Sequence, residues 1–515
     1  MKEFNIAGVC IPEMHYMVDI SAKLENITKL INKGKYFTIN RSRQFGKTTT
    51  LYMLEQKIKE KYIVISTSFE GIGGDILQDE KKFSSRILGI FADDMRFVDK
   101  EMSDKLNGLN TGIENLDDLS KTITELCYNS EKKIVLMIDE VDKSCDNQLF
   151  LHFLGMLRNK YLDRDKKKDY TFHSVILAGV HDVKSLKLKL RPEEETKYNS
   201  PWNIAEDFEV DMTFNREEIA TMLNEYEEEN KIGMDIGEIS EEIYKYTSGY
   251  PFLVSKICKV IDEKINKIWT IESVEQAVKI ILKENNTLFE SLIKNLENDR
   301  KLYGVIYEVI VNGVRIGFNI HNQVQSKAAM YGIIKSENDR VKVQNIIFEK
   351  LIYNYMISNR ETSSKIETKY ADRNKFVNSG ILDMELILDK FQELMMQEYR
   401  EKDEDFIEKK GRLIFLEFIK PIINGVGDYF IEPEMIDNKK MDIVIKYGIE
   451  KYIIELKIWR GEKYEERGVE QLLDYMKIQK EETGYMVVFD FRKEKKEYKN
   501  EWIEVEGRRI YEVVV

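Results

Sequence analysis

The sequence has few cysteines, few prolines and no long hydrophobic run, and each absence narrows the class of protein. It contains 4 cysteines and 6 prolines in 515 residues. The cysteines lie far apart, show no C-x-x-C spacing and are too sparse for a disulfide framework, so we expect buried thiols in a reducing cytoplasm. The scarcity of proline indicates a compositional bias of the genome and bears little on function.

No stretch of the chain approaches the roughly 20 consecutive apolar residues that a membrane-spanning helix needs. The N-terminal region carries Glu3 and only a short apolar patch at residues 6–11, which predicts that there is no secretory signal. We find no internal repeat and no low-complexity linker. The sequence therefore predicts a cytoplasmic protein that has no membrane partner.

The charge balance limits how the chain can contact nucleic acid. Charged residues make up 33% and hydrophobic residues 43% of the sequence, and the net charge is −13. This composition is typical of a globular protein, and the length allows about two to four domains. The negative charge argues against general adhesion to nucleic acid, so DNA contact would need local basic surface. The basic residues at 492–496 alternate with glutamates, which favours a solvated strand end.

A glycine–lysine–threonine segment predicts a phosphate-binding loop near the N-terminus. A short apolar strand at residues 35–40 runs into this segment, and Leu51, Leu54 and Ile58 follow it with helical spacing. Such a loop requires this strand–loop–helix order. Arg41 stands where the first glycine of the G-x-x-x-x-G-K-[ST] pattern belongs. The predicted nucleotide-binding residues are Arg43, Gln44, Phe45, Gly46, Lys47, Thr48 and Thr49.

Three of these residues have specific predicted roles, with ATP and Mg²⁺ as the cofactors. Gly46 permits the tight turn of the backbone, Lys47 reaches the β- and γ-phosphates, and Thr48 offers its hydroxyl to Mg²⁺. Helices often begin with such residues, so an ordinary helix start is the alternative.

Two later apolar runs predict further strands of the same sheet. Residues 133–138 form a continuous apolar run that ends in Asp139 and Glu140, which is typical of a central parallel strand buried on both faces. Ligands of such sheets bind at the C-terminal ends of strands. We therefore expect Asp139 to belong to the Mg²⁺ shell and Glu140 to polarise the hydrolytic water, unless both are simply surface acids. The strand at residues 174–179 leads to His181, which is either a γ-phosphate sensor or a structural histidine.

Together these residues resemble the AAA-like ATPases of the AAA+/STAND group, in which the loop pattern R-Q-x-G-K-T-T is familiar. The likeness spans about residues 11–283 and includes residues 200–205, which follow the sensor strand. Gly249, Tyr250 and Pro251 match the G-x-P element of STAND lids, so the resemblance implies that Pro251 lies close to the nucleotide. An ordinary helix-breaking turn is the alternative at that position.

The same resemblance places residues 12–19 near the adenine base. Tyr16 and Val18 could stack there, and simple packing of these two side chains is the alternative.

Helical patterns follow the predicted ATPase core. Asn215 and Glu218 form a capping-box-like helix start, and the lid helices are expected at residues 216–229, 239–246, 251–265 and 271–283. Beyond them, helices at residues 301–310 and 325–332 and a hairpin at residues 333–343 resemble a winged helix. Such a segment could contact DNA or serve for packing and oligomerisation, and we favour packing because the neighbourhood is acidic.

Two apolar segments near the C-terminus predict neighbouring β-strands. Asp442 opens the run at residues 443–445, and residues 452–458 alternate charge with hydrocarbon at their end. Strand side chains repeat every second residue, so Lys457 shares a face with Glu455, and Asp442 is expected beside Glu455. Two carboxylates and an ammonium suit a divalent cation and a phosphodiester. An ordinary surface ion pair is the alternative.

The predicted roles at this second site follow from that chemistry. Asp442, Glu455 and the backbone carbonyl of Leu456 would bind Mg²⁺, and Lys457 would orient a water that attacks phosphorus.

These residues resemble the PD-(D/E)XK nuclease superfamily, with Asp442 as the first acid and Glu455 and Lys457 in the E-x-K element. The resemblance covers about residues 411–493. It implies a catalytic role for the helical glutamine Gln471 and makes Glu417 the candidate for an upstream helical acid. The proline of the first motif is missing before Asp442.

The expected fold is therefore α/β and multidomain: a P-loop parallel-sheet ATPase with a helical lid and a winged-helix-like domain, and a C-terminal restriction-endonuclease-like fold. The predicted segments are residues 1–213 for the ATPase core, 214–290 for the lid, 291–357 for the winged-helix-like domain, 358–380 for a linker and 381–515 for the nuclease-like domain.

Three functions are compatible with these features. The first is an ATP-regulated or ATP-driven nuclease that cuts DNA, and its resemblance to prokaryotic fusions of this kind implies a role in defence or mobile-element biology. The second is a signalling switch, in which the nuclease fold is a recognition or assembly module; the missing loop glycine favours it. The third, a DNA translocase or helicase, is disfavoured because extended basic surface is absent. We also consider a homo-oligomer, in which copies of this chain associate.

Overall fold

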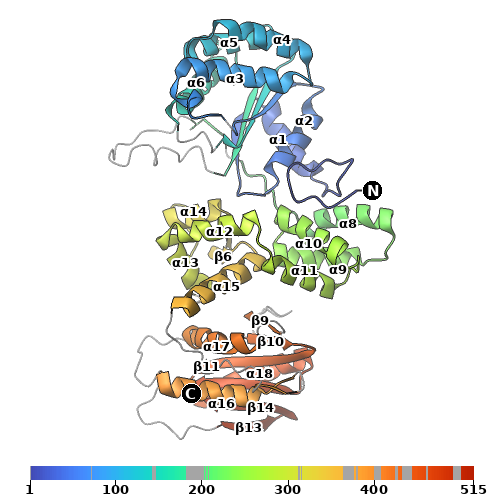
Figure 1. Cartoon of the computed structure of the whole chain (residues 1–515), viewed down its shortest axis with the longest axis vertical. Helices are drawn as coiled ribbons and strands as arrows, with labels where there is room; N and C mark the ends of the chain where they lie inside the picture. Colours follow the sequence, from blue (N-terminus) through green and yellow to red (C-terminus); the bar gives the residue numbers. More distant parts are fainter. Residues whose placement is uncertain are drawn as a thin grey trace. The chain divides into compact units, whose positions relative to one another are not determined.

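The chain folds into two compact units, which Figure 1 shows coloured along the sequence. The first unit contains Met1–Tyr303 and Ile316–Ile352, and the second contains Gly304–Arg315 and Tyr353–Val515. The computed structural model describes residues 2–515 with the exception of residues 71, 142–146, 181–201, 203, 207, 311–313, 315, 364–375, 379–380, 399–407, 424–426, 432–442, 460–461 and 491–499. Within the described residues, no helix is both long enough and apolar enough to span a membrane.

A four-stranded parallel sheet forms the centre of the first unit. Its strands lie in the order β1 (Tyr36–Asn40), β4 (Ser174–Gly179), β3 (Ile134–Asp139) and β2 (Ile63–Ser68). Every residue of β3 and β4 is buried, as a parallel strand covered on both faces requires. The sheet confirms the α/β, parallel-sheet part of the predicted fold class.

Helices cover both faces of this sheet. On one face, α3 (Glu80–Met95), α5 (Leu116–Tyr128) and α6 (Gln148–Asp165) pack through the main hydrophobic core, with α4 (Lys100–Leu109) against α3. Figure 1 shows α1 (Ser21–Asn32) and α2 (Lys47–Ile58) on the opposite side of the sheet. This layering leaves the C-terminal ends of β1, β3 and β4 together at one edge.

Four helices occupy the segment predicted as the lid, and this four-helix segment is called the lid below. They are α8 (Arg216–Asn230), α9 (Ile236–Thr247), α10 (Pro251–Lys264) and α11 (Ile271–Lys283). The capping box is confirmed, because Asn215 accepts from the Glu218 backbone N–H and the Glu218 side chain accepts from the Asn215 backbone N–H. These reciprocal bonds satisfy two backbone donors at the start of α8.

Two further helices have no counterpart among the helices expected from the sequence. They are α12 (Thr287–Glu297) and α15 (Ile346–Ser363), the latter continuing to residue 363 within the segment predicted as the linker. The predicted helix pair is present as α13 (Arg300–Ile310) and α14 (Gln323–Met330). The predicted hairpin is also present, as β5 (Ile334–Glu337) paired antiparallel with β6 (Arg340–Val343). The domain boundaries themselves stay predictions.

A six-stranded mixed sheet forms the centre of the second unit. Its order is β13 (Asn500–Val505), β14 (Arg508–Val514), β12 (Thr483–Phe489), β11 (Glu450–Ile458), β10 (Ile443–Tyr447) and β9 (Gly427–Ile431). Strands β11, β12 and β14 are parallel, and the other pairs are antiparallel. The two predicted C-terminal strands are therefore confirmed as neighbours, β10 and β11.

Three helices accompany this second sheet. Helix α18 (Glu462–Gln479) connects β11 to β12, and its residues Leu472, Tyr475 and Met476 share a hydrophobic core with one face of the sheet. Helices α16 (Met384–Glu398) and α17 (Glu408–Ile423) pack together and against β14 and β11, respectively. Two very short strands, β7 (Val377–Asn378) and β8 (Ile381–Leu382), precede α16.

Gly249, which precedes α10, lies in close contact with the backbone of Phe214, which precedes α8. Gly249 has φ +70°, and a Cβ at this position would lie 1.8 Å from the carbonyl oxygen of Phe214. The Phe214 N–H also donates to the Gly249 carbonyl at 2.8 Å. Two backbones in contact cannot separate without breaking this hydrogen bond, so only glycine fits here.

We expect Gly249→Ala to destabilise the protein by more than ~4 kcal/mol, because the new methyl group overlaps a backbone carbonyl. Gly233→Ala is the matched control. Gly233 also has positive φ (+77°), but it has no atom within 4 Å of the added Cβ, so its cost should be only ~1–2 kcal/mol. Denaturant unfolding followed by tryptophan fluorescence measures both values. Equal values for the two variants would contradict the close approach at Phe214.

Candidate functional site

The loop between β1 and α2 makes its turn at Gln44 and Gly46. Both residues have left-handed backbone conformations, with φ of +55° and +77°, and Gly46 is the N-cap of α2. Arg41, which replaces the first glycine of the motif, does not have positive φ. Its guanidinium donates to the carbonyl oxygens of Asn40 and Val210 at 2.9 and 2.8 Å. The missing glycine is therefore not needed at the position where the motif has it.

The side chain of Lys47 lies inside the curve of this loop. It is 6% exposed, and its ammonium donates to the carbonyl oxygens of Arg41 at 3.0 Å and Ser42 at 2.9 Å. These two bonds orient the ammonium toward the backbone of the loop. Both of these carbonyl acceptors are neutral.

Thr48 and Asp139 come together across the sheet edge. The Thr48 hydroxyl donates to Asp139 Oδ2 at 2.6 Å, and the backbone N–H of Glu140 donates to Asp139 Oδ1 at 2.8 Å. Asp139 is 7% exposed, so its carboxylate is held in one orientation at the end of β3. A hydroxyl and a carboxylate oxygen in contact are the hard donors that Mg²⁺ prefers. The predicted pair therefore fits this cation.

Glu140 follows Asp139 in a left-handed conformation, with φ +54°. Such a conformation is uncommon for a residue other than glycine and is frequent at functional sites. Thr49, the last residue of the predicted segment, accepts a hydrogen bond from the backbone N–H of Cys10 at 3.1 Å. His181, the predicted sensor, lies outside the described residues.

The lid reaches this loop through Tyr250 and Pro251. Pro251 occupies the first turn of α10, and a Cβ built on Gly46 would lie 3.8 Å from the Pro251 Cβ. The Tyr250 hydroxyl donates to the Arg43 carbonyl oxygen at 2.5 Å and lies 3.1 Å from Ser42 Oγ. The structure therefore brings the predicted Pro251 to the predicted loop.

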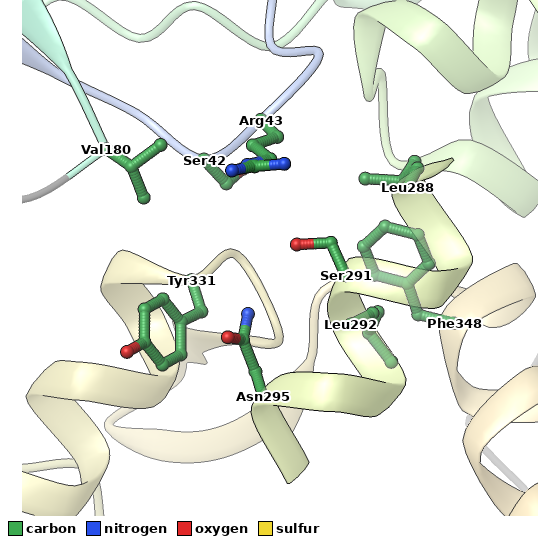
Figure 2. Close-up of a pocket in the computed structure, with 9 residues that line it drawn as sticks. All are labelled: Ser42, Arg43, Val180, Leu288, Ser291, Leu292, Asn295, Tyr331 and Phe348. Carbon is green, nitrogen blue, oxygen red and sulfur yellow. The ribbon is translucent and has the colours of Figure 1, made fainter. Parts of the chain in front are cut away.

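Outside the loop there is a small pocket of about 130 Å³. Figure 2 shows Ser42 and Arg43 of the loop on one side of it and Ser291 and Asn295 of α12 on the other. Gly332 also approaches the loop here, since a Cβ on this glycine would lie 2.5 Å from Ser42 Oγ. Helix α12 and the segment after α14 thus line the outer side of the phosphate-binding segment.

A second pocket, of about 250 Å³, lies beside the N-terminal segment. Its apolar lining includes Pro12, Met17, Val18 and Met53, and α8 contributes Thr221 and Glu225. Tyr16 packs elsewhere, in an aromatic cluster with Phe4 and Tyr226. The Tyr16 hydroxyl donates to Glu229 at 2.6 Å, and burial, aided by Glu229, raises the pKa of Tyr16 to about 12. Of the two predicted stacking residues, Val18 lines this pocket and Tyr16 does not.

In the second unit, Glu455 and Lys457 lie on the face of β11 that α18 covers. Glu455 is completely buried, and its Oε1 lies 2.7 Å from Lys457 Nζ. A Cβ on Gly468 of α18 would lie 3.2 Å from Lys457 Cγ, which shows how closely the helix approaches the lysine. The burial contradicts a surface ion pair, the alternative that the sequence left open. The pair is instead enclosed between sheet and helix.

The other predicted residues of this site are only partly placed. Gln471 of α18 donates through Nε2 to the Tyr475 hydroxyl at 2.7 Å. Leu456 pairs with Val487 of β12. Asp442 lies outside the described residues, as does the Glu417 side chain, and among the residues that are described no group of three or more His, Cys, Asp or Glu side chains could hold a metal ion.

Tyr250, Thr287 and Gly332 also lie around the loop, and the sequence patterns predict no role for them. Gln44 Nε2 donates to Thr287 Oγ1 at 3.2 Å, across 243 residues of sequence. Tyr250 was part of the quoted Gly-Tyr-Pro element, but only its proline was assigned to the site. For Gly332 and Thr287 no local signal exists, because contacts between residues so distant in sequence depend on the packed fold.

A family model described as an AAA-like domain matches residues 12–354, which is more than half of the 515 residues. Similar solved structures include a Walker-type ATPase of Pyrococcus abyssi, with 13% identity and a TM-score of 0.48 over 68% of this chain and 99% of that chain.

Two further similar structures come from Aeropyrum pernix. Its ORC2 protein, in ADPNP–ADP complexes, has 13% identity and a TM-score of 0.32 over 68% of this chain and 97% of that chain. Its ORC1 protein, in complex with DNA, has 11% identity and a TM-score of 0.29 over 67% of this chain and 94% of that chain. No curated protein matches the chain significantly.

Proposed function

The chain belongs to the AAA-like domain family, and on this premise we propose that its first unit binds and hydrolyses ATP with Mg²⁺. We propose further that its second unit is a Mg²⁺-dependent nuclease that acts on DNA. The two parts rest on different observations and are tested separately.

The ATP-binding part of the proposal rests mainly on the contact between Thr48 and Asp139. A threonine hydroxyl 2.6 Å from a buried carboxylate at the edge of a parallel sheet is the donor pair that holds Mg²⁺ beside the phosphates in P-loop NTPases. When bound, the cation would neutralise charge that develops on the phosphate oxygens. The first turn of α2 also directs backbone N–H groups at the same place, where an anion is favoured.

The remaining residues have complementary roles in this proposal. Lys47 would donate to the β- and γ-phosphates from the position at which the Arg41 and Ser42 carbonyls hold it. Glu140, next to Asp139, would accept a proton from the attacking water. The pocket lined by Pro12, Met17, Val18 and Met53 would accept the adenine base, which needs an apolar enclosure.

Lys47→Ala should weaken ATP binding by about tenfold to a hundredfold, because charge-assisted hydrogen bonds to phosphate are lost. Glu140→Gln should keep ATP affinity and lower the turnover rate at least about a hundredfold. Lys57→Ala is the matched control, since Lys57 lies on the same helix and pairs with Glu25 at the surface. Isothermal titration and a phosphate-release assay give both quantities. Unchanged affinity in Lys47→Ala would disprove the loop assignment.

We propose a packing role for the helix pair and hairpin, which we interpret as a winged-helix-like domain. Lys327 forms an ion pair with Asp299 at 2.6 Å, and Lys342 forms one with Glu337. Phe348 at the start of α15 contacts the Tyr250 ring, with the centroids 5.2 Å apart. Cations that already have acidic partners contribute little to phosphate binding, so this segment suits contact with the lid better than contact with DNA.

The nuclease part of the proposal rests mainly on the buried pair of Glu455 and Lys457. Burying an ion pair often costs more desolvation free energy than the mutual attraction returns, and this pair lies on a sheet face that Gly468 of α18 approaches closely. Glu455, the Leu456 carbonyl and Asp442 would hold Mg²⁺ through oxygen donors, and that cation would stabilise charge on the phosphodiester. Lys457 would orient the attacking water.

Purified wild-type protein should cut DNA when Mg²⁺ or Mn²⁺ is present, with ATP titrated into the assay. Supercoiled, linear duplex and single-stranded DNA serve as substrates. Asp442→Ala and Lys457→Ala should each reduce the rate at least about a hundredfold, because the metal and its water are assembled jointly. Lys451→Ala is the control: this lysine is on the same strand and bonds to Gln479 at 2.8 Å, so cleavage should not change.

The same assay separates the proposal from its main alternative. An ATP-dependent signalling switch would use the second unit as a recognition or assembly module. Its signature would be ATP binding that depends on Lys47, with no cleavage of any substrate by the wild type. Cleavage that persists in Lys457→Ala would instead assign the activity to another site or a contaminant.

A further inference from the structure

The turn in the phosphate-binding loop is held at a residue that does not favour it. Gln44 has φ +55°, a left-handed conformation that brings Cβ of an L-residue too close to the following carbonyl oxygen. Such a residue persists only where its surroundings hold it in place. Gly46 adopts its own positive φ without this cost, so the strain of the loop is concentrated at Gln44.

Two residues from the helical part of the first unit, Tyr250 and Thr287, hold residues 42–44. Tyr250 donates to the Arg43 carbonyl oxygen at 2.5 Å and lies 3.1 Å from Ser42 Oγ. Thr287, at the start of α12, accepts from Gln44 Nε2 at 3.2 Å. The peptide unit between residues 43 and 44 is therefore fixed on its carbonyl side by Tyr250, and the Gln44 side chain is fixed by Thr287.

Tyr250 is itself rigidly placed. The side chain is completely buried, and its ring contacts Phe45 at 4.8 Å and Phe348 at 5.2 Å between centroids. Burial raises the pKa of the Tyr250 hydroxyl, so the group remains a hydrogen-bond donor at any ordinary pH. The hydroxyl bonds to a backbone carbonyl oxygen. This contact therefore depends on the conformation of the loop and not on a particular loop side chain.

We propose that Tyr250 is a positioning residue for ATP binding, which holds Gln44 in the left-handed turn and so keeps the loop carbonyls around Lys47. The inference rests on the proposed ATP-binding function and deepens it. Tyr250 acts through the loop: it fixes Ser42 and Arg43, the Ser42 carbonyl holds the Lys47 ammonium, and Lys47 meets the phosphates. A phosphate-binding loop without its first glycine is thus shaped from outside by a tyrosine of the lid.

A double-mutant cycle on the full-length chain tests this proposal. Tyr250→Phe removes the hydroxyl and keeps the ring packing, so the variant should fold. It should raise the KM for ATP about fivefold to tenfold, as expected for one lost hydrogen bond, with kcat within about twofold. Gln44→Gly removes the backbone strain at the turn. In that background, Tyr250→Phe should change KM less than about twofold, because the tyrosine no longer holds a strained residue.

Tyr226→Phe is the control for a merely structural role of a buried lid tyrosine. Tyr226 is also buried and donates to Asp262 at 2.6 Å, away from the loop. It should lower the melting temperature without changing KM for ATP. Thr287→Val, which removes the acceptor of Gln44, should raise KM in the same direction as Tyr250→Phe.

The outcomes distinguish this inference from the function on which it rests. Wild-type protein that binds no ATP would overturn the proposed function together with the inference. Wild-type binding with an unchanged KM in Tyr250→Phe would overturn the inference alone. An equal effect of Tyr250→Phe with Gln44 and with Gly at position 44 would also overturn it, since the tyrosine would then act independently of the turn.

Discussion

The hydrogen bond from Thr48 to Asp139 joins the start of α2 to the end of β3, and the arrangement of the loop depends on it. Strand β4 lies between β1 and β3, so the chain that leaves β1 must cross the end of β4 before Thr48 can meet Asp139 at 2.6 Å. Only a few residues are available for this crossing. The left-handed conformations of Gln44 and Gly46 turn the backbone within that length.

The features that could be predicted from sequence are those whose signals lie within a few residues of each other. The apolar run before Asp139, the Asn215–Glu218 capping box and the alternation of Glu455 with Lys457 are local patterns, and each corresponds to the element or shared face that it predicts. Helix α12 also has a local sequence signal, although it is not among the predicted helices. Asn286 caps it, and Leu288, Leu292 and Leu296 repeat every four residues along its buried side.

The contacts around the loop could not be predicted in this way. The hydrogen bond between Tyr250 and Arg43 joins residues that are 207 positions apart, and Gly332 approaches Ser42 across 290 positions, from 42 to 332. No periodicity or propensity encodes such a pair, because it exists only after the lid has packed against the sheet. The resemblance to the G-x-P element indicated Pro251. It gave no role to the neighbouring Tyr250, whose hydroxyl bonds to the loop.

The two lysines at the candidate sites differ in what holds them, and this difference decides what each can bind. Lys47 is held by the carbonyl oxygens of Arg41 and Ser42, which are neutral acceptors. Lys457 lies against the carboxylate of Glu455, and the pair has little net charge with which to attract a phosphodiester. A chain of net charge −13 adds a repulsive background for DNA. In the proposed function, the second site would therefore need a divalent cation both to attract the phosphodiester and to support its cleavage.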